Sequence, residues 1–286
     1  MENNRFSFNR FGKYFLYDIK ATWKNTGVLF LVLALFPVVT YLIYLLYEAI
    51  FTGNLWTTIT TGEEVMKGPG IAVRLVFLVI VTFVLALVIP SRAYGHITEK
   101  KSGSEWLMLP ASRFEKYLSM MLNTLIFIPL AFFAIYFLSD AAICLLDSSC
   151  GTPIVASNIN GLMEEHMGEM PFRLVNNGFW IAFINYIDYA VVFLVGALIF
   201  KKWKIVGTII ALWAISTVFA TAGSLLFIGT NMMTFAETMA AKITNFLSSN
   251  ADHLDLIFNG FINLQIIIIT AICAVIIWFR LKKLQH

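Results

Sequence analysis

An aspartate inside a long apolar stretch is the residue best placed to do chemistry in this sequence. Asp188 lies within the apolar run 179–200, close to Asn185. A carboxylate in such surroundings can contact a polar substrate or handle protons, and it can equally be a packing group bonded to a neighbouring tyrosine or amide. We therefore name Asp188, Asn185 and Asn123 as candidates for a translocation path, and the packing interpretation stays open.

The sequence lacks the residue patterns that hydrolysis or ATP binding would need. All four histidines fall outside the apolar runs, so no nucleophile within the runs has a histidine base. No Gly-x-x-x-x-Gly-Lys-Ser/Thr loop occurs, so the chain is not expected to hydrolyse ATP. We expect it to be no enzyme and to bind neither a cofactor nor a metal by itself.

The three cysteines do not predict a disulfide framework. Cys144 and Cys150 lie at the predicted outer end of one apolar run and just beyond it. They could form a local bridge in an oxidising compartment. Two unpaired thiols fit the sequence equally well.

Six apolar runs must position these side chains. Each is long enough for a helix that crosses about 30 Å of hydrocarbon, which needs roughly 20 residues. Only a helix satisfies its own backbone in lipid, and the chain is 59% hydrophobic and 13% charged. The sequence therefore predicts an all-α integral membrane protein with six transmembrane helices. Their ranges are 27–47, 71–94, 117–146, 179–200, 203–229 and 256–279.

The distribution of basic residues predicts the topology. Sixteen of the twenty Lys and Arg lie before the first run, at or after the end of the second, at the junction of the fourth and fifth, and after the last. This positive-inside bias places both termini in the cytoplasm and makes 147–178 and 230–255 outer loops. Because the apolar runs separate these basic groups along the chain and no tract resembles a nucleic-acid arm, we expect the lipid bilayer, and no nucleic acid, as their partner.

Residues 1–26 carry a helical pattern of their own. Phe8, Phe11, Phe15, Ile19 and Trp23 recur at three- and four-residue steps, with basic residues on the other side. That pattern predicts an amphipathic helix in the inner headgroup layer, ahead of a six-helix transmembrane domain at 27–286.

The loop between the second and third runs is the densest in local signals. Ser104 can cap a short helix that continues through Met108 and ends at Pro110. Ser112 with Glu115 then predicts a capping box at the start of the third membrane helix. A short apolar helix is thus expected at the cytoplasmic surface, where the membrane or another protein could cover it.

The stretch from Gly103 to Arg113 reads Gly-Ser-Glu-Trp-Leu-Met-Leu-Pro-Ala-Ser-Arg, which resembles the ABC-2 family of ATP-binding-cassette transporter permeases. The whole architecture also resembles that family, with its amphipathic first helix, six spans and helical loop. The resemblance implies that loop 95–116 docks on a separate ATPase subunit. It assigns ATPase coupling to seven residues: Ser104, Glu105, Trp106, Leu107, Met108, Arg113 and Glu115.

The same resemblance implies the rest of the assembly. ATP and Mg would be bound by the partner ATPase, and a second permease copy or a paralogue would complete the pathway. It implies an exporter in the bacterial cytoplasmic (inner) membrane. Two alternatives come from other classes: a non-transporting immunity or scaffold protein, and a secondary transporter driven by an ion gradient that uses Asp188.

Overall fold

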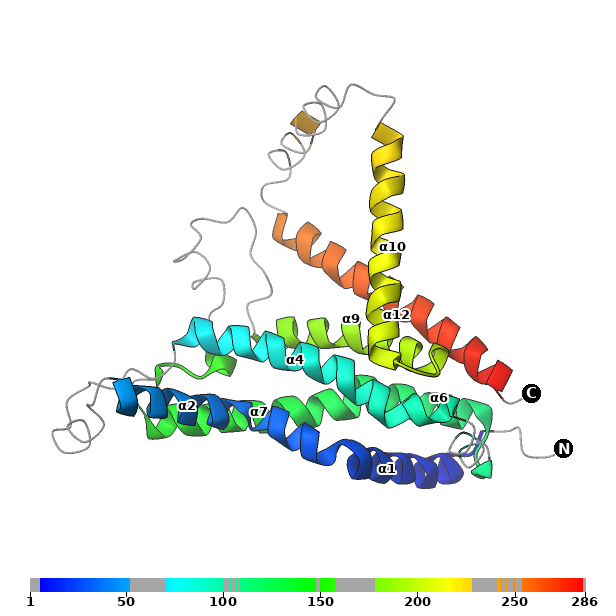
Figure 1. The fold of residues 1–286 in the computed structure, drawn as a ribbon, viewed down its shortest axis with the longest axis horizontal. Helices are drawn as coiled ribbons and strands as arrows, with labels where there is room; N and C mark the ends of the chain where they lie inside the picture. The colour runs from blue at the N-terminus through cyan, green and yellow to red at the C-terminus, as the bar shows by residue number, and fades with distance from the viewer. Residues whose placement is uncertain are drawn as a thin grey trace.

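The computed structural model is helical throughout its regular structure, and no strand occurs in the part of the chain that it describes (Figure 1). The described residues are 6–51, 70–99, 103, 106, 108–147, 150–157, 178–227, 241–242, 245, 249 and 254–284. The main helices are α1 (Phe8–Ala34), α2 (Phe36–Phe51), α4 (Ile71–Tyr94), α6 (Arg113–Leu122), α7 (Ile128–Leu146), α9 (Gly178–Ile199), α10 (Lys204–Phe227) and α12 (Leu254–Leu284). Short 3₁₀ turns, η1 (Gly95–Thr98) and η4 (Ile154–Ala156), and a π-helix, η2 (Asn123–Phe127), complete them.

Five of these helical segments are long and apolar enough to cross a membrane. The count becomes six if α1 and α2, which meet at an angle of 45°, form one span. The predicted class, a helical membrane protein, is therefore confirmed by length and composition.

The first predicted span is not one straight helix. α1 ends at Ala34 with Leu35 as its C-cap, and α2 has Pro37 in its first turn. Proline lacks an N–H and disfavours helix in the residue before it, so the chain bends where the run 27–47 contains Pro37. The boundary expected after residue 26 is likewise absent, because α1 continues through it.

Polar residues line the inward face of α1. Tyr14, Asp18, Thr22 and Thr26 follow one another at four-residue steps, and all are buried. In this first part of α1 several apolar side chains lie outside, with Phe8 83% exposed, whereas Phe30 and Leu33 nearer its end are buried in the core. This inverted pattern suits a helix whose outer face meets lipid.

α9 lies at the centre of the bundle. It packs against α4 along much of its length and also contacts α12 and α10. Figure 1 shows α4 and α9 running side by side, while α10 projects away from this layer. Gly196 on α9 allows the close approach of α10, because a Cβ there would overlap the side chain of Thr208.

The third span contains a widened turn. The π-helix η2 separates α6 from α7 and lies immediately before Ile128 and Pro129. Proline cannot donate to the carbonyl four residues earlier and its ring crowds that carbonyl, so a π turn accommodates it within a continuous helix.

Candidate functional site

The loop between α4 and α6 folds back into the bundle through Trp106. Only 7% of this side chain is exposed. It belongs to a cluster made by the ends of four helices: Ala93 and Tyr94 of α4, Met120 of α6, Leu194 and Leu198 of α9, and Ile277 and Leu281 of α12. The placement differs from the expectation that Trp106 faces a partner protein, because an indole can cover its apolar area inside the chain instead.

Lys116 of α6 binds the same loop at Trp106. Its side chain is almost fully buried, and its Nζ donates to the carbonyl oxygen of Trp106 at 2.9 Å. The ammonium also lies 4.7 Å from the centroid of the indole ring. Tyr14 of α1 is hydrogen-bonded with the Trp106 side chain. The loop is thus fixed to α6 and α1 at a single residue.

Other predicted coupling residues have different positions. Met108 is 83% exposed, two residues beyond the buried indole. Arg113 is half-buried in the first turn of α6. Ser104, Glu105 and Leu107 lie outside the described residues. The loop therefore has an inward anchor, Trp106, and an outward apolar side chain, Met108.

The predicted capping box at the start of α6 is confirmed. The backbone N–H of Glu115 donates to Ser112 Oγ at 3.3 Å, and the N–H of Ser112 donates to Glu115 Oε2 at 2.7 Å. The buried Glu115 carboxylate also receives Arg10 through Nε at 2.7 Å and Nη2 at 2.8 Å. The N–H of Ser7 completes its partners at 2.9 Å. A fork-to-carboxylate pair of this geometry ties the start of α1 to the start of α6.

A buried polar network links α1, α4 and the third span. Asp18 Oδ2 accepts from the Tyr94 hydroxyl at 2.9 Å and from Ser119 Oγ at 2.7 Å. Asn123 Nδ2 donates to the Tyr94 hydroxyl at 2.8 Å and to Thr22 Oγ1 at 3.0 Å. Sequence reasoning missed Asp18, whose only signal was its place on the polar side of an amphipathic helix.

No hydrogen bond within the described part of the chain joins the three candidate translocation residues, Asn123, Asn185 and Asp188. Asn123 is buried in η2, with the partners on α1 and α4 described above. Asp188 and Asn185 lie on α9 and are partly exposed. Asp188 Oδ1 has no hydrogen-bond partner within the described part of the chain. η2 and α9 nevertheless touch, because the Tyr186 hydroxyl donates to the carbonyl oxygen of Thr124 at 2.9 Å.

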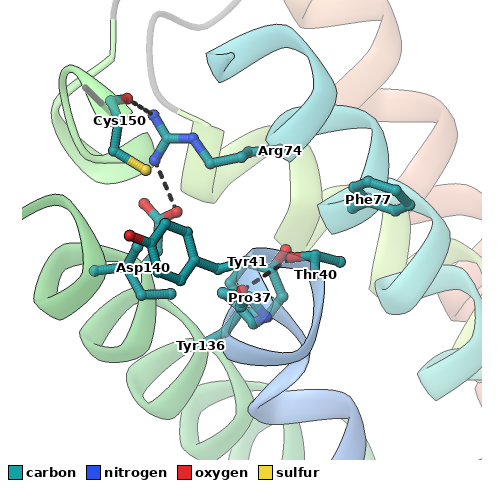
Figure 2. Close-up of a pocket in the computed structure, with 9 residues that line it drawn as sticks. Pro37, Thr40, Tyr41, Arg74, Phe77, Tyr136, Asp140 and Cys150 are labelled. Carbon is teal, nitrogen blue, oxygen red and sulfur yellow. Dashed lines mark hydrogen bonds and ion pairs between the residues drawn. The ribbon is translucent and has the colours of Figure 1, made fainter. Parts of the chain in front are cut away.

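A second charged cluster lies at the opposite end of the bundle (Figure 2). Arg74 Nη1 donates to Asp140 Oδ1 at 2.9 Å, and both side chains are buried. Arg74 Nη2 donates to the carbonyl oxygens of Cys150 at 2.7 Å and Thr152 at 2.9 Å, while Asp140 Oδ2 accepts from the N–H of Ile154 at 2.8 Å. Arg74 and Asp140 line a cavity of about 10 Å³ together with Tyr41 and Tyr136. This volume has room for about one water molecule.

Among the residues that the structure describes, no three His, Cys, Asp or Glu side chains gather as metal ligands would. Comparisons with family models, curated proteins and solved structures find no match to the chain. The function is therefore inferred from the residues and contacts of this chain.

Proposed function

We propose that this chain is the membrane-spanning permease subunit of an ATP-driven ABC-2 type transporter, an exporter. A separate ATPase subunit would act on it through loop 95–116. The observation that carries the proposal is that the loop has one buried and one exposed apolar side chain. Trp106 is buried among the ends of four helices, whereas Met108 stands open to a partner.

A loop with a buried Trp106 and an exposed Met108 suits a coupling element. A partner that binds the exposed side of the loop and displaces it would move Trp106. Trp106 packs in one cluster with the ends of α4, α6, α9 and α12, so these helix ends would be displaced as well. Packed side chains transmit displacement because interiors are dense and respond as units. The docking surface would therefore centre on Met108, with Trp106 as the internal anchor rather than a contact residue.

The start of α1 would move with the same loop. Arg10 binds Glu115 with two hydrogen bonds, and Glu115 lies in the first turn of α6. A displacement of loop 95–116 would thus reach α1 as well as α4 and α6. Such linkage supports a switch between inward and outward access.

The rest of the assembly follows from the proposal. ATP and Mg would belong to the ATPase, and a second permease copy or paralogue would complete the pathway in a bacterial cytoplasmic membrane. The apolar side chains that α10 exposes, among them Trp213 and Phe219, suit either lipid or such a second permease.

The test is purification of the tagged chain from its native membrane, followed by mass spectrometry of the proteins that accompany it. A stoichiometric protein with a Walker A loop is expected. Met108→Glu should reduce its recovery, and Leu145→Glu, at an equally exposed leucine of α7, should not. A clean preparation without an ATPase would favour the alternatives, a scaffold or immunity protein or a transporter driven by an ion gradient.

A second candidate, a transporter driven by an ion gradient, is favoured by one observation. Asp188 Oδ1 is buried without a hydrogen-bond partner among the described residues, as a carboxylate that exchanges a proton or cation can be. This candidate predicts that Asp188→Asn abolishes transport in vesicles that contain no ATP. The ABC-2 proposal predicts no transport in such vesicles for either protein.

A further inference from the structure

Two cysteine thiols meet beside the Arg74 cluster. Cys144 lies in the last turn of α7, and Cys150 begins the segment that leads into η4. The N–H of Cys150 donates to the carbonyl of Asp147 at 3.2 Å, which turns the chain back toward the helix end. The side chains of Cys150 and Cys144 are hydrogen-bonded with each other, and both are free thiols.

The ion pair holds both cysteines in place. Arg74 Nη1 donates to Cys144 Sγ at 2.9 Å, and Arg74 Nη2 donates to the carbonyl oxygen of Cys150 at 2.7 Å. Asp140 fixes the guanidinium and also binds the N–H of Ile154, in the segment that carries Cys150. Figure 2 shows Arg74 reaching between Asp140 and Cys150. The contact between the two thiols is therefore positioned by the buried Arg74–Asp140 pair.

The two thiols differ in the chemistry open to them. Cys150 is 4% exposed, and burial raises the pKa of its thiol to about 12, so it is almost wholly protonated at neutral pH. Cys144 is half-buried beside the exposed Leu145, with a cationic N–H donor aimed at its sulfur. Partial exposure next to a guanidinium is typical of reactive cysteines. Cys144 is thus the attacking thiol and Cys150 the resolving one.

We infer that Cys144 and Cys150 form a redox-active dithiol, which closes to a disulfide by exchange with a disulfide-bearing small molecule or protein. Cys144 loses its proton to solvent, and its sulfur bonds to one donor sulfur while the donor S–S bond breaks and a first thiolate leaves. Cys150 then loses its proton, and its sulfur attacks the Cys144 sulfur while the second donor thiolate leaves. Two protein thiols are oxidised, and the donor disulfide is reduced to two thiols.

Closure would fasten the segment 150–157 to the end of α7. Arg74 of α4 and Asp140 of α7 already hold that segment through its backbone. The disulfide would therefore lock the neighbouring ends of these two helices together, and reduction would release them. This inference does not depend on the proposed transport function.

The test uses the full chain in detergent, without reductant and with Cys273→Ala, so that Cys144 and Cys150 are the remaining cysteines. Oxidised glutathione serves as the disulfide donor, and intact mass reports the products. We expect the chain to lose two hydrogen atoms and to retain no glutathione. Cys150→Ser should retain one glutathione on Cys144, and Cys144→Ser should react at least about tenfold more slowly.

Three results would overturn the inference. One is a glutathione adduct that persists while both cysteines are present. Another is equal reaction of the two single-serine variants. The third is no reaction of the two-thiol chain under conditions that oxidise a free peptide dithiol. Size-exclusion profiles that match the parent protein ensure that each variant is compared in its folded state.

Discussion

Replacing Asp140 with asparagine isolates the buried charge pair at one end of the bundle. The substitution keeps the size of the side chain and one oxygen that can accept a hydrogen bond. It removes the negative charge that faces Arg74 at 2.9 Å. Because both side chains are almost fully buried, little water can replace the lost partner.

The expected cost follows from that burial. Asparagine can keep the bond from the N–H of Ile154, which Asp140 accepts at 2.8 Å, but the Arg74 guanidinium loses its counter-charge. Removing one member of a buried pair typically destabilises a protein by about 3–5 kcal/mol. The remaining partners of Arg74 are two backbone carbonyls and the Cys144 thiol, and none of them carries the charge of a carboxylate.

The assay is unfolding of the purified protein in mixed micelles of a mild detergent and sodium dodecyl sulfate, followed by circular dichroism. Asp147→Asn is the matched control, because Asp147 is less buried and accepts a bond from Tyr41 that asparagine can also accept. It should cost about 1 kcal/mol or less. Equal losses for the two variants would refute the assignment of Arg74–Asp140 as a buried, mutually dependent pair.

Three further substitutions test contacts elsewhere in the bundle. Asp18→Ala should cost about 1–3 kcal/mol for each hydroxyl left without its acceptor, measured in the same unfolding assay. Gly196→Ala should cost about 1–3 kcal/mol through overlap with Thr208, and adding Thr208→Gly should make the double variant less unstable than the summed single changes. Lys116→Met removes the donor to the Trp106 carbonyl, so limited proteolysis of loop 95–116 should quicken roughly fivefold or more while the helices stay intact.

Local features of the fold were predictable because their causes lie within a few residues. Ser112 and Glu115 form the capping box that their spacing predicts. Helices cover the apolar runs, although the first run is divided between α1 and α2, because a helix satisfies its own backbone hydrogen bonds in lipid. The bend at Leu35 was not predicted, although its cause, Pro37, stands inside the first run.

The inward faces of the helices were harder to predict. In a soluble helix an apolar stripe marks the core, but the core-facing side of α1 carries Asp18 and Thr22 while Phe8 lies outside. Lipid supplies an apolar surrounding, so hydrophobicity alone does not tell the inside from the outside. The same ambiguity explains Trp106, whose indole suits a partner surface and a buried cluster equally well.

Long-range polar pairs could not be predicted from one sequence. Arg10 and Glu115 stand 105 residues apart, and Arg74 and Asp140 stand 66 apart. Each has other residues of opposite charge nearer in the chain. Only the packing of α1 on α6 and of α4 beside α7 selects these partners.

The most direct test of the coupling proposal is a photo-crosslinking amino acid placed at Met108 in the native membrane. Leu145 is the matched control, since it is apolar and 85% exposed but lies at the far end of α7. The account predicts that position 108 crosslinks to a polypeptide with a Walker A loop and that position 145 does not. Crosslinks from position 108 to lipid alone, or equal ATPase crosslinks from both positions, would contradict it.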